Sequence, residues 1–168
     1  MREKGKKEMS SYVNFYLRIN DNFAPIGDFS RNSKVYETYY GCGFSSYERI
    51  LPLHEEHLRI LKDYVIRKIK TEKETKERYE KRISLIMNAE NTPLNEKLEE
   101  IDYIEEAIGE ISQDIEEYEY ARNYFDFLED MIVNYHFSDK SFENDYFHYI
   151  YAGIEANGDL ESVGEGYV

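Results

Sequence analysis

Cysteine and proline are scarce in this 168-residue chain, and tryptophan is absent. The single cysteine, Cys42, excludes an intramolecular disulfide and any zinc site built from several cysteines. The chain has no run of about 18 apolar residues, and no apolar signal-peptide core follows the charged segment Met1–Ser11. We therefore expect a soluble protein of a reducing cytoplasm, with no membrane association.

Basic residues are also few: 21 Lys and Arg stand against 35 Asp and Glu, a net charge of -14. Such an acidic surface repels phosphate backbones, so direct nucleic-acid binding is not expected. The sequence contains neither a Walker motif nor Gly-x-Gly-x-x-Gly, which excludes the common phosphate cradles. The 17 Tyr and 9 Phe far exceed what disordered chains contain, and the length suits one domain.

Alternating hydrophobicity near the amino terminus predicts a β-hairpin. Its first strand starts at Tyr12, and its second, Phe23–Phe29, contains a proline that places it at the sheet edge. Either Ser30 or Ser33 is expected to cap a short helix over Lys34–Tyr40.

Apolar residues spaced three and four apart then predict two long helices joined by a short link. The pattern of the first helix is lost through Thr71–Arg78, whereas the second keeps an apolar seam for about five heptads, as coiled coils do. The short link makes the helices antiparallel neighbours. Aromatic and β-branched residues over Asp145–Glu155 predict a last strand that pairs with the hairpin.

These elements predict an α+β fold. A small antiparallel β-sheet, formed by the hairpin and the carboxyl-terminal strand, carries a short helix and a long projecting antiparallel coiled-coil helical hairpin. We expect a flexible basic arm over residues 1–11, a single domain over 12–155 and a loose acidic tail over 156–168. Within the domain, 12–50 and 140–155 form the sheet region and 54–133 the helical hairpin.

The negative charge is concentrated on the second long helix, since residues 90–133 carry 15 acidic and 2 basic side chains. Its outer face presents a carboxylate every ~5–6 Å, a spacing of the same order as that of phosphates along a nucleic-acid strand. We expect this row to bind a partner by imitating phosphates; it comprises Glu99, Asp102, Glu106, Glu110, Glu116 and Glu117. The alternative is a solvated face whose flanking acids pair with the first helix, namely Glu100, Glu105, Asp114 and Glu119.

Two other surfaces are candidates for association. The predicted sheet holds more tyrosines than one face could bury, and Tyr16, Tyr149 and Tyr151 are expected to bind a partner or, equally, to line the sheet internally. The polar stretch of the first helix cannot cover the seam of the second. An alternative function is therefore a homodimerising coiled-coil structural or adaptor module. Its expected homodimer seam is formed by Ile104, Ile108, Ile111 and Ile115.

Candidate chemistry is sparse. His54 and His57 are close enough on a helix to share a metal, but two histidines at a helix start more often cap it. Cys42 lies between two glycines without a nucleophile motif, and the histidines available as its base, which include His136 and His148, belong to no catalytic pattern. We expect no enzyme, no metal and no cofactor.

The chain is small and strongly acidic, is rich in Tyr, Lys, Ile, Asn and Glu, and lacks a catalytic signature. It resembles the accessory proteins of phages and mobile elements in low-GC bacteria, among them inhibitors of the anti-CRISPR and anti-defence type. The resemblance implies a non-enzymatic inhibitor in the cytoplasm of a bacterial host. Such an inhibitor binds a basic nucleic-acid-processing protein, such as a Cas-type effector, and covers its nucleic-acid groove or locks its conformation.

Overall fold

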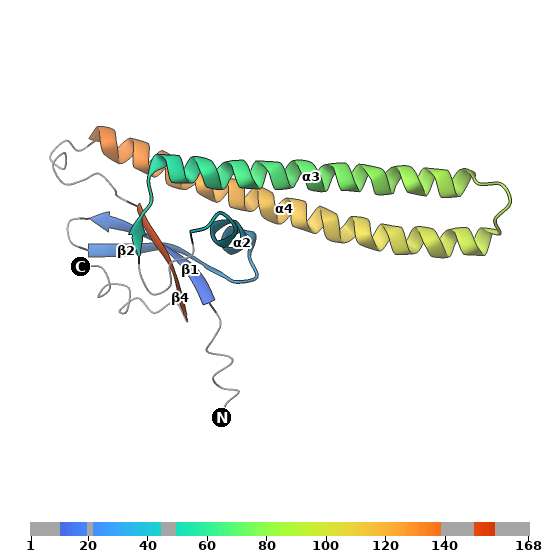
Figure 1. The fold of residues 1–168 in the computed structure, drawn as a ribbon, viewed down its shortest axis with the longest axis horizontal. Helices are drawn as coiled ribbons and strands as arrows, with labels where there is room; N and C mark the ends of the chain where they lie inside the picture. Colours follow the sequence, from blue (N-terminus) through green and yellow to red (C-terminus); the bar gives the residue numbers. More distant parts are fainter. Residues whose placement is uncertain (1–10, 20–21, 45–49, 139–149, 157–168) are drawn as a thin grey trace, which may run out of the picture.

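The computed structural model describes residues 11–19, 22–44, 50–138 and 150–156, which form an α+β fold (Figure 1). Four antiparallel strands pair in the order β2-β1-β4-β3: β1 is Ser11–Ile19, β2 Asn22–Ser30, β3 Leu51–Pro52 and β4 Ile150–Ala156. The described helices are the short α2 (Lys34–Gly41) and the long α3 (Glu55–Asn88) and α4 (Leu94–Ser138). The predicted fold class is confirmed.

The sheet differs from the prediction in one strand. β2 lies at an edge, as its proline predicts, and β4 pairs with β1. The sequence reading missed β3, which has only two residues and therefore shows no alternation. Ser11 and Ala156 belong to strands, whereas the rest of the predicted arm and tail, like residues 140–149, lies outside the described residues.

Local capping sets where two helices begin. The Ser33 hydroxyl accepts the backbone N–H of Tyr36 at 3.1 Å, so Ser33 is the cap of α2. At the start of α3, the backbone N–H of His54 donates to Nδ1 of His57 at 3.0 Å. This hydrogen bond satisfies one of the donors that a helix start leaves without an intrahelical partner.

The main core fills the space between the sheet, α2 and the base of the helical hairpin. Its fully buried side chains come from each of these layers: Val13 and Phe15 of β1, Val35 of α2, Leu58, Leu61 and Val65 of α3, and Ala121, Phe125 and Leu128 of α4. Among the residues described, this core takes side chains of α3 only up to Ile69 and of α4 only from Tyr118 onward.

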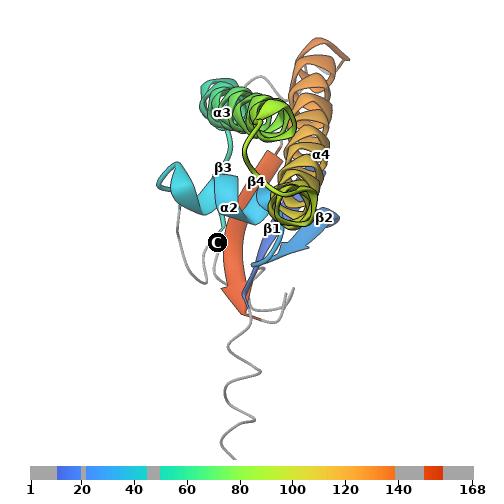
Figure 2. The same ribbon diagram turned by 90° about the vertical axis from the view of Figure 1, so that its right-hand side faces the viewer.

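The rest of the helical hairpin projects beyond the sheet (Figure 1). In the end-on view, both long helices lie on the same side of the sheet, with α2 beside them (Figure 2). In the projecting part, Ile101 and Ile104 are buried, although neither belongs to the main core. The projecting part therefore presents most of its surface to solvent.

A close approach of backbone and ring fixes α4 on the sheet. The β1–β2 register shifts between Phe15 and Tyr16, and the Tyr124 hydroxyl donates to the carbonyl oxygen of Ile26 at 3.2 Å. A Cβ on the adjacent Gly27 would overlap the Tyr124 hydroxyl. Burial raises the pKa of Tyr124. Glycine is thus required here to let the ring reach the strand.

Candidate protein-binding surface

Two groups stand out among the acidic side chains of α4, and the first is paired within the chain. Five carboxylates on the side of α4 that faces α3 and α2 form ion pairs: Lys62 with Asp126 (2.6 Å) and Glu129 (2.7 Å), Lys34 with Asp114 (3.6 Å), Lys73 with Glu119 (3.9 Å) and Arg82 with Glu100 (3.6 Å). The predicted pairing with the first helix is confirmed for Glu100 and Glu119, whereas Glu105 is exposed and forms no ion pair with a described residue. Asp114 pairs instead with α2.

The second group is the outer row. Its five exposed carboxylates form no ion pair with any described part of the chain; they belong to Glu99, Asp102, Glu106, Glu110 and Glu116. Glu117 is half-buried and accepts a hydrogen bond from Gln113 at 3.1 Å. The structure therefore exposes five of the six carboxylates that the sequence predicted for this row.

The spacing of the outer row follows from helix geometry. Glu99, Asp102, Glu106 and Glu110 are separated by three, four and four residues. A rise of 1.5 Å per residue therefore places successive carboxylates ~5–6 Å apart along the axis. Tyr103, which is 75% exposed, lies among them. The row is thus a regular line of negative charge on a rigid element.

Two of the tyrosines predicted to bind a partner, Tyr16 and Tyr151, are buried inside the fold. Tyr16 and Tyr151 are 1% and 6% exposed and form a small cluster with Ile50, against which Phe23 packs. Arg18 Nη1 donates to the Tyr151 hydroxyl at 3.3 Å. Their predicted place in a partner-binding surface is wrong, because the chain itself covers both rings. Tyr149 lies outside the described residues.

The seam predicted for homodimerisation is partly covered within the chain. Ile104 is only 5% exposed and lines a small cavity with Tyr79, so the expectation that it is uncovered is wrong. Ile108, Ile111 and Ile115 are half-buried.

The register of the two helices explains this difference. Near the tip, the two helices keep the register of a hairpin symmetric about its link, since Arg82 pairs with Glu100 at 3.6 Å. Closer to the base, Lys73 reaches Glu119 rather than the neighbourhood of Ile108. The register near the tip brings Tyr79, which directly follows the polar stretch, to the cavity that Ile104 also lines.

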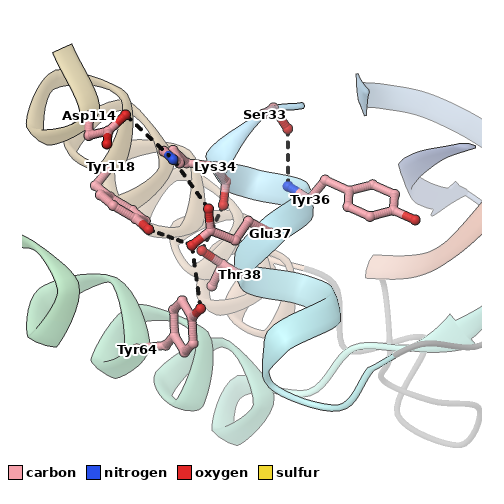
Figure 3. A network of polar contacts seen from close by, with 8 residues as sticks. All are labelled: Ser33, Lys34, Tyr36, Glu37, Thr38, Tyr64, Asp114 and Tyr118. Carbon is pink, nitrogen blue, oxygen red and sulfur yellow. Dashed lines mark hydrogen bonds and ion pairs between the residues drawn. The ribbon is translucent and has the colours of Figure 1, made fainter. Parts of the chain in front are cut away.

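A network around Glu37 joins α2 to both long helices (Figure 3). The Glu37 carboxylate accepts hydrogen bonds from the Tyr118 hydroxyl, from Lys34 Nζ at 3.2 Å and from the Tyr64 hydroxyl at 3.5 Å. Lys34 Nζ also lies 4.9 Å from the centre of the Tyr118 ring and pairs with Asp114. The network fastens α2 to the helical hairpin.

The surroundings of Glu37 in this network favour the charged form of its carboxylate. Burial, the largest effect, would raise the pKa of Glu37, but hydrogen bonds from Tyr118 and Lys34 and the nearby positive charges of Lys34 and Lys68 lower it overall. Burial, with Glu37 beside it, raises the pKa of Tyr118. Both groups therefore hold the form that hydrogen-bonds best, ionised Glu37 and neutral Tyr118. The sequence reading missed this network.

The groups considered for chemistry have structural roles where the structure describes them. His57 serves the start of α3, and burial together with the neighbouring His54 lowers its pKa. Cys42 is half-buried, and burial raises the pKa of its thiol, which disfavours the reactive thiolate. The side chains of His136 and His148 lie outside the described part of the chain.

Within the described ranges, no three His, Cys, Asp or Glu side chains are grouped so as to hold a metal ion. No helix in those ranges has the length and apolarity needed to span a membrane. No protein-family model, curated protein or solved structure matches the chain.

Proposed function

We propose that this protein is a non-enzymatic inhibitor that acts by binding another protein. Its outer row occupies a basic surface on which a nucleic-acid-processing protein, such as a Cas-type effector of a bacterial host, holds its nucleic acid. The observation that carries the proposal is the division of the α4 carboxylates. Those beside α3 and α2 have basic partners, whereas the five of the outer row have none in the described chain.

The electrostatics of the row favour a basic partner. Like charges one turn apart on a helix repel one another and reduce its stability by a few tenths of a kcal/mol per pair. A basic surface removes that repulsion and attracts the row from a distance, which raises the association rate.

The architecture supports the same proposal. The row lies on the projecting part of α4, away from the sheet, where a partner can approach without contacting the sheet (Figure 1). Glu99 and Glu110 are separated by about 16 Å of helix rise, the length of several nucleotides of backbone. Inhibition then needs only occupation of the groove, with no metal or cofactor.

The test compares two variants with the same change of charge. In the first, Glu99, Asp102, Glu106 and Glu110 are replaced by Lys; in the matched control, four exposed acids of α3, Asp63, Glu74, Glu77 and Glu80, are replaced by Lys. Parent and both variants serve as baits in a bacterial lysate. Proteins retained by parent and control but lost by the first variant are then purified, and their binding is challenged with nucleic acid.

We expect a nucleic-acid-binding protein in that set, and we expect nucleic acid to displace the inhibitor from it. Equal capture by both variants, or binding unaffected by saturating nucleic acid, would overturn the proposal.

A further inference from the structure

A small cavity opens beside the outer row, between α3 and α4. Its volume is about 210 Å³, and its lining combines two aromatic rings, two apolar side chains and two carboxylates: Tyr79, Tyr103, Ile104, Ala107, Glu106 and Glu110. Pockets for drug-sized ligands measure about 300–1,000 Å³, so this cavity suits a single side chain.

The lining of this cavity suits a cation. A tyrosine ring attracts a positive charge over its face, and two carboxylates one helical turn apart add a full charge each. Neither Glu106 nor Glu110 forms an ion pair with a described residue, so neither charge is already neutralised in that part of the chain. Ile104 and Ala107 offer apolar surface to the hydrocarbon stem of a long basic side chain.

Arginine matches this set better than lysine. The planar guanidinium stacks on aromatic faces and donates two parallel hydrogen bonds to a carboxylate, whereas the ammonium of lysine is compact and strongly hydrated. The cavity combines a carboxylate pair with tyrosine rings at one place. A regular row of carboxylates alone would not distinguish the two cations.

We infer that this cavity is a specificity pocket for one arginine side chain of the basic partner. The inference rests on the proposed function and adds to it. The outer row supplies charge attraction along the helix, and the Tyr79–Tyr103 cavity selects a guanidinium at one fixed position. The pocket thereby sets the register of the inhibitor on its partner.

The experiment uses fluorescently labelled nona-arginine and nona-lysine peptides as probes at physiological ionic strength, with the full chain. Tyr103→Leu removes the exposed ring of the pocket, and Tyr103→Phe keeps it. Tyr120→Leu is the matched control, because Tyr120 is also an exposed tyrosine on α4 but does not line the cavity. Tyr103 is 75% exposed, so its replacement does not threaten folding.

We expect the parent to prefer the arginine peptide. Tyr103→Leu should weaken arginine binding by about two- to fivefold, as loss of one cation–π contact does, and should reduce the preference over lysine. Tyr103→Phe and Tyr120→Leu should leave both affinities unchanged. In ring-labelled tyrosine spectra, the arginine peptide should shift the Tyr79 and Tyr103 signals.

Two results would overturn the inference, and they separate it from the proposed function. If Tyr103→Leu and Tyr120→Leu bind alike while lysine reversal of the outer row abolishes binding, the pocket is wrong and the acidic row stands. If reversal of the outer row has no more effect than reversal of Asp63, Glu74, Glu77 and Glu80, both are wrong.

Discussion

The base and the projecting part of the helical hairpin differ in how their side chains are packed and paired. At the base, α3 and α4 pack on the sheet and α2, and three carboxylates there, Glu37, Asp126 and Glu129, have hydrogen-bond or ionic partners. In the projecting part, α4 keeps Ile101 and Ile104 buried while its outer carboxylates face solvent. The comparison distinguishes residues that stabilise the fold from exposed residues that are available to a partner.

The largest difference between the two parts should appear in matched leucine truncations on α3. Leu61 is fully buried at the base, whereas Leu85 is 71% exposed near the tip. Leu61→Ala should lower the free energy of unfolding by about 2–5 kcal/mol, because it removes core contacts and leaves a cavity. Leu85→Ala should change it by about 0.5 kcal/mol or less. Denaturant unfolding of both variants measures the difference, and equal losses would contradict the division.

A second test concerns how α4 is seated on the sheet. Gly27→Ala should cost about 1–3 kcal/mol, because the new methyl group overlaps the partly buried Tyr124 side chain. In a Tyr124→Leu background the same change should cost much less, which a double-mutant cycle measures. Additive costs in the cycle would mean that Tyr124 does not set the requirement for glycine.

A third test uses the pH dependence of the Glu37 network. Glu37→Gln should lower the free energy of unfolding by about 1–2 kcal/mol at neutral pH, after allowance for the partial exposure of the carboxylate. Because the folded-state pKa of Glu37 is lowered, its contribution is complete above the unfolded pKa and disappears as pH falls through the folded pKa.

The stability difference between parent and Glu37→Gln should therefore shrink as the pH is lowered from 4.5, the ordinary value for Glu. Urea unfolding of both proteins across that range provides the measurement. A difference that stays constant into strong acid would show that the charge of Glu37 contributes nothing to the network.

The smallest change in stability is expected for the outer row. Replacing Glu99, Asp102, Glu106 and Glu110 by Lys should leave helicity intact and shift the free energy of unfolding by about 1 kcal/mol or less, toward greater stability. Circular dichroism during thermal unfolding measures both. A large loss of stability would mean that these carboxylates support the fold.

The sequence predicted those features that repeat along the chain. Alternation in β1, the three-and-four spacing of α3 and α4, and the outward face of α4 all follow from periods of 2 and 3.6 residues. The cap of α2 was predicted as one of two alternatives, because Ser30 and Ser33 both precede the helical pattern. The structure shows that Ser33 is the cap.

The sequence could not predict features that depend on how the elements meet. Glu37, Tyr64 and Tyr118 lie on three different helices, so no local pattern predicts that they meet. The burial of Tyr16 by Ile50 and Tyr151 joins three separate segments. The burial of Ile104 involves Tyr79, which lies on the other long helix. Each of these is a tertiary contact, and short-range periodicity carries no information about it.

The central claim is that the outer row binds a basic surface, and one affinity measurement tests it most directly. A purified partner is titrated with the parent, with the four-fold outer-row variant and with the matched α3 variant, at low ionic strength and at about 0.15 M. We predict that the outer-row variant loses several kcal/mol of binding, with tenfold in affinity for each 1.4 kcal/mol, and that parent binding weakens steeply with salt. Equal affinities of the two variants at both ionic strengths would contradict the account.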